Sequence, residues 1–252
     1  MTHARGGERV PPLRPITTAI LVDGGFYRKR AAVLFGKLPP EARARELLWY
    51  CHRHVEHFHS DLYRIFYYDC APSERVVYHP LTRRQVNLSK SVQHEWMTQF
   101  LRELSSKRKV AIRRGEELHT QGNYALNERA LKKLCRGEIG VTDLSEEDFY
   151  LAITQKGVDM KLGIDIVTLA EQRLVNQIVM ISGDSDFVPA AKHARRLGID
   201  FVVDPMWARI AESLGSISTA YGRERPSQAG TRMVPAPAAR SGVGQGALLR
   251  DL

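Results

Sequence analysis

Short apolar runs that end in an acidic residue recur along the chain. The first, TTAILVDGG, is followed by LYRIFYYD, QIVMISGDSDF and IDFVVDP. Runs of this length, rich in β-branched and aromatic residues and bounded by Gly, Asp or Pro, are typical of strands buried in a parallel sheet. The pattern therefore predicts four strands, each with an acid at or just beyond its carboxyl end. These acids are Asp23, Asp69, Asp184 and Asp204.

Helical periodicity fills the intervals between these runs. Apolar residues recur at helical spacing from Glu41 to His59, in KGVDMKLGIDIVTLAEQRL, and in PAAKHARRLG, where Gly198 is expected to cap the helix. Another helix, before the strand-like KVAIRR, is predicted from Val92, Trp96, Phe100 and Leu104. Strands that alternate with helices form right-handed βαβ units. We therefore expect an α/β fold with a doubly wound, mostly parallel sheet and helices on both faces.

One domain accounts for most of the chain. A length of 252 residues accommodates one large domain with tails more readily than two separate cores. We place this domain at residues 16–221, with an insertion of weak pattern at about 71–150. Residues 1–15 form a basic tail. Residues 222–252, rich in Gly, Pro, Ala, Arg and Ser without periodicity, are predicted to be disordered.

Composition narrows the classes of function. The formal charge of +9 favours a polyanionic partner, but more than half of it lies in the two tails, so charge alone is weak support for RNA binding. No apolar run approaches the roughly 20 residues of a membrane span, and residues 1–15 lack the apolar segment of a secretory signal. A cytoplasmic protein without membrane contact is expected. Cys51, Cys70 and Cys135 are too far apart for a C-x-x-C zinc site.

The acids at the strand ends carry the strongest chemical signal. In a doubly wound sheet the loops after the carboxyl ends of the strands line one crevice, so acids that are distant in sequence converge there. Carboxylates that lie close together repel one another, and each must bind a proton or share a cation. Hard divalent ions take oxygen ligands, and Mg²⁺ needs only one or two direct carboxylates. The sequence therefore predicts a site for Mg²⁺ or Mn²⁺.

The acids differ in how strongly they indicate this site. A single aspartate after a strand is more often a turn former or a helix cap, so Asp69 and Asp204 stay outside the predicted set. In S-G-D-S-D, the i and i+2 acids Asp184 and Asp186 present oxygens to one point, and Asp186 is the better candidate for capping the next helix. Asp159 opens a predicted helix, where the helix dipole favours a carboxylate whatever its function.

Other polar residues near these motifs carry weaker signals. Asp165 is turned by about 120° around the helix from Asp159 and is expected to have a structural or supporting role. Lys156 precedes that helix and can meet a phosphate group. The basic residues that can line an RNA channel are Arg83, Arg84 and Lys90. His54 and His57 have i, i+3 spacing, but no cysteine lies nearby to complete a zinc site, so this reading is disfavoured.

Three segments in this order resemble a known family. ILVDGGFYRKR, KGVDMKLGIDIVTLA and VMISGDSDFVPAAKHARRLGIDFVVDP together resemble the NYN domain, including its bacterial LabA-like members, over roughly residues 17–221. The resemblance implies a PIN-like fold and a metal-dependent ribonuclease. It matches Asp23, Asp159, Asp184 and Asp186 to the family's motif acids, and Asp165 to the later acid of the KGVD motif. Many members carry an asparagine three residues after the first aspartate, where this chain has Phe26.

The leading hypothesis is an endoribonuclease that uses Mg²⁺ or Mn²⁺ and acts on single-stranded or exposed RNA. One or two ions activate water for in-line attack on a phosphodiester. Asp23, Asp159 and Asp184 are the expected ligands, Asp186 orients the water, and Ser182 hydrogen-bonds a ligand. The alternative is a non-catalytic regulator that binds RNA or protein through the same fold. A metal-dependent phosphatase is a third reading, and homo-oligomerisation is left open.

Overall fold

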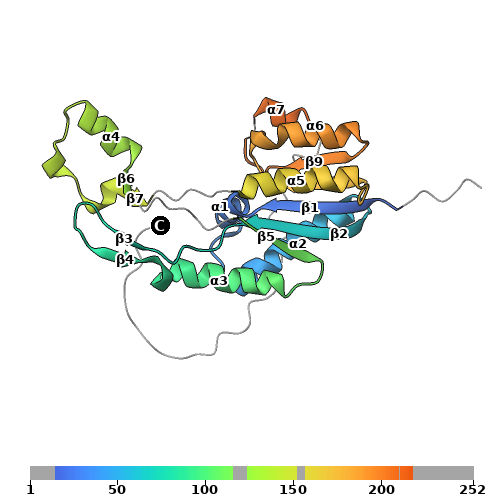
Figure 1. Ribbon diagram of the computed structural model, residues 1–252, viewed down its shortest axis with the longest axis horizontal. Coiled ribbons are helices and arrows are strands. Elements are labelled where there is room, and N and C mark those ends of the chain that lie inside the picture. Colours follow the sequence, from blue (N-terminus) through green and yellow to red (C-terminus); the bar gives the residue numbers. More distant parts are fainter. Residues whose placement is uncertain (1–14, 116–123, 152–156, 210, 218–252) are drawn as a thin grey trace, which may run out of the picture. The chain divides into compact units, whose positions relative to one another are not determined.

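Five parallel strands form the central sheet of the computed structural model, which describes residues 15–115, 124–151, 157–209 and 211–217 (Figure 1). Their order across the sheet is β5-β2-β1-β8-β9. The strands are β1 (Thr17–Asp23), β2 (Asp61–Asp69), β5 (Val110–Arg114), β8 (Gln177–Ile181) and β9 (Asp200–Asp204). Every pairing between neighbours is parallel. The predicted α/β class, the parallel sheet and the strand positions are confirmed.

Strand β1 explains why its sequence is continuously apolar. Ala19 and Leu21 belong to the core on one face of the sheet, and Ile20 and Val22 to the core on the other. All four side chains are fully buried. Because successive side chains of a strand point to opposite faces, a strand covered on both faces needs apolar residues at every position.

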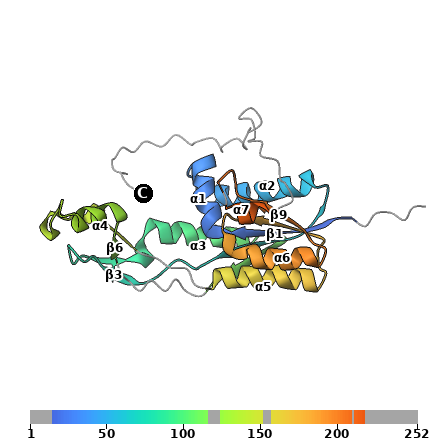
Figure 2. The same ribbon diagram turned by 90° about the horizontal axis from the view of Figure 1, so that it is seen from above.

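Helices cover both faces of the sheet (Figure 2). The core that contains Ile20 and Val22 also takes in residues of α1 (Gly24–Phe35), α2 (Pro40–His57) and α3 (Val92–Ser105). The core that contains Ala19 and Leu21 takes in residues of α5 (Val158–Glu171), α6 (Val188–Arg196) and the short α7 (Glu212–Gly215). The predicted apolar stripe of α5 is buried, and Gly198 has the left-handed φ of 87° expected after the end of α6.

Helix α3 departs from its prediction at its first residue. Val92 is 84% exposed because it stands in the first turn of the helix, directly after the capping residue Ser91. The helical spacing of Trp96 predicts a place for it in the core. It is partly buried, its ring is stacked on Phe100 with the centroids 5.0 Å apart, and its indole N–H donates to the Leu38 carbonyl at 3.0 Å. The apolar stripe therefore begins at Trp96.

The region of weak sequence pattern holds more regular structure than expected. An antiparallel pair joins β3 (Val76–Tyr78) to β4 (Gln85–Asn87), and a second joins β6 (Tyr124–Leu126) to β7 (Phe149–Leu151), with α4 (Glu128–Cys135) between β6 and β7. The short 3-10 turns are η1 (Leu88–Lys90), η2 (Val141–Asp143) and η3 (Glu146–Asp148). The buried ring of His79 packs on Tyr124 and Phe149 and so connects the two strand pairs.

The predicted tails fall outside the described residues, except for Pro15. The described residues belong to one compact unit. Within this part of the chain, no helix combines the length and the apolar character needed to cross a membrane.

Candidate active site at the carboxyl edge of the sheet

Asp23 ends β1 and caps the helix that follows. Its Oδ1 accepts the backbone N–H of Phe26 at 3.0 Å, and its Oδ2 accepts the hydroxyl of Ser182 at 3.2 Å. Burial raises the pKa of Asp23; the two hydrogen bonds oppose this rise and the charge of Asp184 adds to it. The chain thus holds this carboxylate in one orientation within an environment that disfavours its charge.

The turn after β8 brings two more carboxylates to the same edge. Ser182 is fully buried, and its Oγ also accepts the backbone N–H of Asp184 at 3.2 Å. The Asp184 carboxylate accepts the N–H of Asp186 at 2.9 Å and caps the 3-10 turn η4 (Ser185–Phe187). The expectation that Asp186 is the cap is wrong, because the helical turn begins at Ser185, directly after Asp184. Asp186 is exposed.

Asp159 approaches this edge from the first turn of α5. Gly157, two residues before Asp159, has a φ of 79°, a left-handed conformation that glycine adopts without steric cost. Burial raises the pKa of Asp159, and the negative charges of Asp23, Asp184 and Asp186 raise it further. Four carboxylates from three separate segments therefore act on one another electrostatically.

No arginine, lysine or histidine within the described ranges forms an ion pair with any of these four aspartates. Two other acids at the same edge differ in this respect. Asp69, which is 1% exposed, pairs with the Arg28 guanidinium and accepts the Tyr67 hydroxyl at 2.9 Å. Gly24 packs so closely on Asp69 and Tyr67 that a Cβ there would collide with both. Asp69 is therefore a buried ion-pair partner and not a helix cap.

Asp204 is compensated in a different way. The Tyr50 hydroxyl donates to its Oδ2 at 2.5 Å, and His54 Nε2 lies 2.9 Å from the same oxygen. Burial alone would raise the pKa of Asp204, but the contacts with His54, Tyr50 and the Met206 amide hold it below its ordinary value. Because Oδ1 accepts the Met206 N–H at 2.8 Å, Asp204 is also a turn former, as its sequence context indicated. His54 serves this network and not the alternative zinc pair with His57.

Asp165 lies on α5 but belongs to another set of contacts. Its Oδ2 accepts the Tyr68 hydroxyl at 2.8 Å and the Arg113 Nε–H at 2.8 Å. These contacts give it the structural role that its angular offset from Asp159 indicated.

The predicted basic residues do not contact the four aspartates where the structure describes them. Arg83 and Arg84 lie between β3 and β4, Lys90 ends η1, and Arg84 Nη2 is 3.4 Å from a carboxylate oxygen of Glu146. Lys156 lies outside the described residues. Sequence reasoning missed Arg28 and Tyr67, which compensate Asp69. The basic run at the start of α1 was the available signal, but it does not say which acid Arg28 meets.

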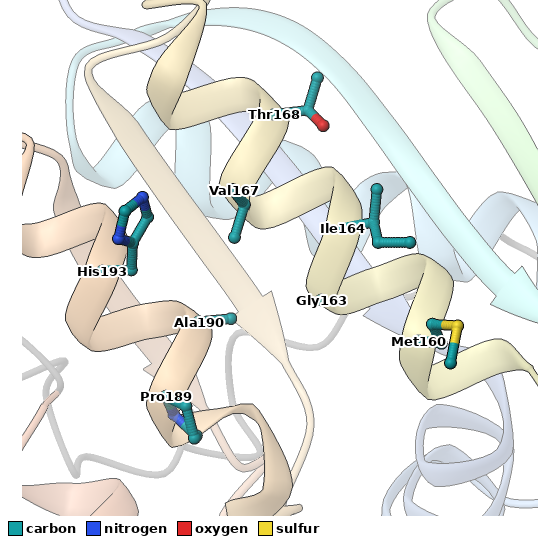
Figure 3. Close-up of a pocket in the computed structure, with 8 residues that line it drawn as sticks. All are labelled: Met160, Gly163, Ile164, Val167, Thr168, Pro189, Ala190 and His193. Atoms are coloured by element: carbon teal, nitrogen blue, oxygen red, sulfur yellow. The ribbon is translucent and has the colours of Figure 1, made fainter.

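A groove of about 480 Å³ lies between α5 and α6 (Figure 3). Its lining is mostly apolar and includes Met160, Ile164, Val167 and Ala190. Met160 follows Asp159 directly, yet the lining itself contains no carboxylate. The groove therefore lacks the carboxylate oxygens of a hard-cation site.

The donor set at the edge fits a hard divalent cation. All its members are oxygen donors. Burial and the neighbouring negative charges raise the pKa values of Asp23 and Asp159, and a bound cation relieves this penalty on their charged forms. Among the residues that the structure describes, no three His, Cys, Asp or Glu side chains lie close enough together to hold an ion on their own. An ion of the Mg²⁺ type needs only one or two direct carboxylates and fills its remaining positions with water and phosphate.

Comparison with known proteins adds a family assignment. The sequence family described as the NYN domain matches residues 80–217, which include Asp159, Asp184 and Asp186 but not Asp23. No curated protein matches the chain. Among solved structures, a protein of unknown function from Vibrio parahaemolyticus RIMD 2210633 is similar at 13% identity and a TM-score of 0.40, covering 81% of this chain and 90% of its own.

Proposed function

Because this chain belongs to the NYN domain family, whose members are generally nucleases, we propose that it is a ribonuclease dependent on Mg²⁺ or Mn²⁺. Its substrate is the phosphodiester backbone of single-stranded or exposed RNA. The observation that carries this proposal is the mutual electrostatic influence of Asp23, Asp159, Asp184 and Asp186, without an ion-pair partner among the described residues.

The four aspartates would hold the cation directly or through its water ligands, and the surroundings of each impose different constraints. Asp23 is fixed by the Ser182 hydroxyl and the Phe26 amide, and Asp184 by its cap on η4, so these two offer oriented oxygens. Asp159 and Asp186 are exposed and are free to turn toward substrate or water. When bound, the cation supplies Lewis-acid stabilisation of the charge that develops on the phosphate.

Asp186 also has a role in positioning the nucleophile. Because it is exposed, its carboxylate can orient an attacking water by accepting one of its hydrogens. In-line attack by that water would leave a 5′-phosphate on the product. Analysis of the product ends therefore tests the direction of attack.

The experiment compares Asp184→Asn with Asp61→Asn. Asp61 begins β2 at the opposite end of the sheet and is exposed, so the control makes the same chemical change away from the site. Labelled single-stranded RNA is incubated with Mn²⁺, and folding is checked by circular dichroism. The proposal predicts cleavage by the wild type and by Asp61→Asn, and its loss in folded Asp184→Asn. Full cleavage by Asp184→Asn would refute the assignment.

The same assay distinguishes a ribonuclease from the alternative, a non-catalytic regulator. A regulator that only binds RNA would bind without metal and with a steep salt dependence, and it would leave the RNA intact at long incubation. If the protein instead hydrolyses phosphomonoesters, and added RNA does not inhibit this hydrolysis, the result would indicate a phosphatase.

A further inference from the structure

Phe26 lies between the two turns that carry the innermost carboxylates of the site. Its backbone N–H donates to Asp23 Oδ1 at 3.0 Å, which fixes the residue one helical turn away from that carboxylate. Its ring lies against Gly183, the residue before Asp184. A Cβ added to Gly183 would be 2.7 Å from Cε2 of the ring. Only a glycine at position 183 leaves the ring in this place.

Phe26 is less buried than the other aromatic residues near the carboxylates. Phe187, beside Asp186, is 3% exposed, and Tyr67 and Tyr68 at the end of β2 are fully buried. Phe26, by contrast, is only partly buried, although it packs against the core under α1. Among these four aromatic residues, Phe26 is therefore the least covered, and it lies next to the carboxylates.

We propose that the ring of Phe26 stacks on the base of a nucleotide next to the phosphodiester bound at the aspartates. The inference rests on the proposed ribonuclease function and specifies how its substrate is chosen. Every base has a π face, so stacking on an aromatic side chain tolerates any sequence. Bases inside a duplex are covered on both faces by their neighbours, so the ring selects unpaired nucleotides. The aspartates repel RNA phosphates, and the ring supplies an attraction that does not depend on charge.

The test uses Phe26→Leu, which keeps apolar volume but removes the π face, and Phe26→Tyr, which keeps the ring. The probe is a short single-stranded RNA of mixed sequence, together with a series in which one nucleotide at a time is abasic. Binding is measured by fluorescence anisotropy with Ca²⁺ in place of Mn²⁺, and thermal melting checks that each variant is folded. Cleavage of the same RNAs is followed separately with Mn²⁺.

The expected result is that the effect of Phe26→Leu on binding and the effect of removing one base do not add. We call this dependence the coupling between Phe26 and that base. For the wild type and Phe26→Tyr, one abasic position weakens binding by about tenfold, within the range of base–aromatic stacking. Phe26→Leu weakens binding of the intact RNA by a similar factor, and the same abasic position then costs nothing more. If the two effects simply add at every position, or if Phe26→Leu binds intact RNA as the wild type does, the inference is overturned.

The two proposals fail in distinguishable ways. RNA that is cleaved without coupling between Phe26 and any base overturns the stacking inference alone. RNA that is bound with coupling but never cleaved overturns the ribonuclease function and leaves the contact with the base in place. RNA that neither binds nor is cleaved overturns both.

Discussion

Two groups of aspartates stand at one edge of the same sheet and differ in what surrounds them. Asp69 and Asp204 are buried, and each has a partner from a neighbouring element, Arg28 for the first and His54 with Tyr50 for the second. The four aspartates of the candidate site, Asp23, Asp159, Asp184 and Asp186, have one another as electrostatic neighbours and no ion pair with a described residue.

This contrast separates the acids that stabilise the fold from those that we propose to bind a cation. Removing one member of a buried charge pair strongly destabilises the fold, because the other member is left buried without compensation. A group of like charges raises the free energy of the folded state, and such strain is characteristic of functional sites. Substitutions in the two groups should therefore have opposite effects on stability.

The largest expected effect is on activity, in Asp184→Asn. Loss of a ligand that holds the cation should reduce cleavage of single-stranded RNA on the order of a thousandfold, because Lewis-acid stabilisation worth several kcal/mol is lost. The melting temperature should stay the same or rise, since a negative charge is removed from the cluster. Single-turnover rates and calorimetry measure the two quantities. A fall in melting temperature that accounts for the lost activity would count against the distinction between the groups.

Asp204→Ala should lower the stability of the fold and leave the activity of the folded protein nearly unchanged, the reverse of Asp184→Asn. It leaves His54 and Tyr50 without the carboxylate that they share, so the free energy of unfolding should fall by about 3 kcal/mol. Cleavage per folded molecule should change little at a temperature where the variant is still native. Urea denaturation measures the first and active-site-normalised rates the second. Unchanged stability would show that the network around Asp204 does not hold the fold.

The response to pH provides a third contrast. The pKa values of Asp23 and Asp159 are raised in the folded state, so without metal these two groups favour the folded state more as the pH falls from their raised values toward 3.8. Asp204 has a lowered pKa, so its contribution is complete above 3.8 and is lost as the pH falls through the lowered value.

The affinity for the cation should depend on pH through Asp23 and Asp159, the two groups with raised pKa values. Protons compete with the cation for Asp23 and Asp159. As the pH falls below their raised pKa values, the Kd for Mn²⁺ should therefore rise. The rise should be up to about tenfold per pH unit for each carboxylate that must lose a proton. Calorimetric titration at pH values stepped down from neutral measures this slope. Asp159→Asn should make the slope shallower, and an identical slope would remove Asp159 from the site.

Ser182→Ala should have the smallest effect. The Ser182 hydroxyl donates to Asp23 and accepts from the Asp184 amide, so it orients the carboxylate without touching the ion. Loss of a group that orients a ligand typically costs ten- to a hundredfold, and the low end, about tenfold in Mn²⁺ affinity, is expected because the Phe26 amide still holds Asp23. Ser182→Thr, which keeps a hydroxyl, should retain most of the affinity. If Thr and Ala behave alike, the hydroxyl does not act as proposed.

The parts of the fold that the sequence predicts well are those with a local signature. β1 and β8 are buried on both faces and therefore appear as continuous apolar runs, and α5 has a regular apolar stripe. The small elements are different. α4 has only eight residues, is capped by Asn127, and lies between two short strands whose packing depends on the ring of His79. Their stability comes from tertiary contacts that no local pattern records.

Part of the candidate site also has a local signature. The rule that carboxyl ends of parallel strands converge identifies the edge and the acids at the strand ends, but not Asp159, which approaches from the first turn of α5. It does not tell which acids are compensated, because Arg28 meets Asp69 and His54 meets Asp204 only after α1 and α2 have packed on the sheet. The capping of η4 by Asp184 in place of Asp186 likewise depends on where the first helical turn begins, and sequence leaves that uncertain by a residue or two.

The most direct test of the central claim is the anomalous diffraction of a crystal soaked in Mn²⁺. The account predicts a manganese peak at the carboxyl edge of the sheet, coordinated by one or two oxygens from among Asp23, Asp159, Asp184 and Asp186, and its disappearance in Asp184→Asn. Saturating Mn²⁺ with no peak among these carboxylates would contradict it.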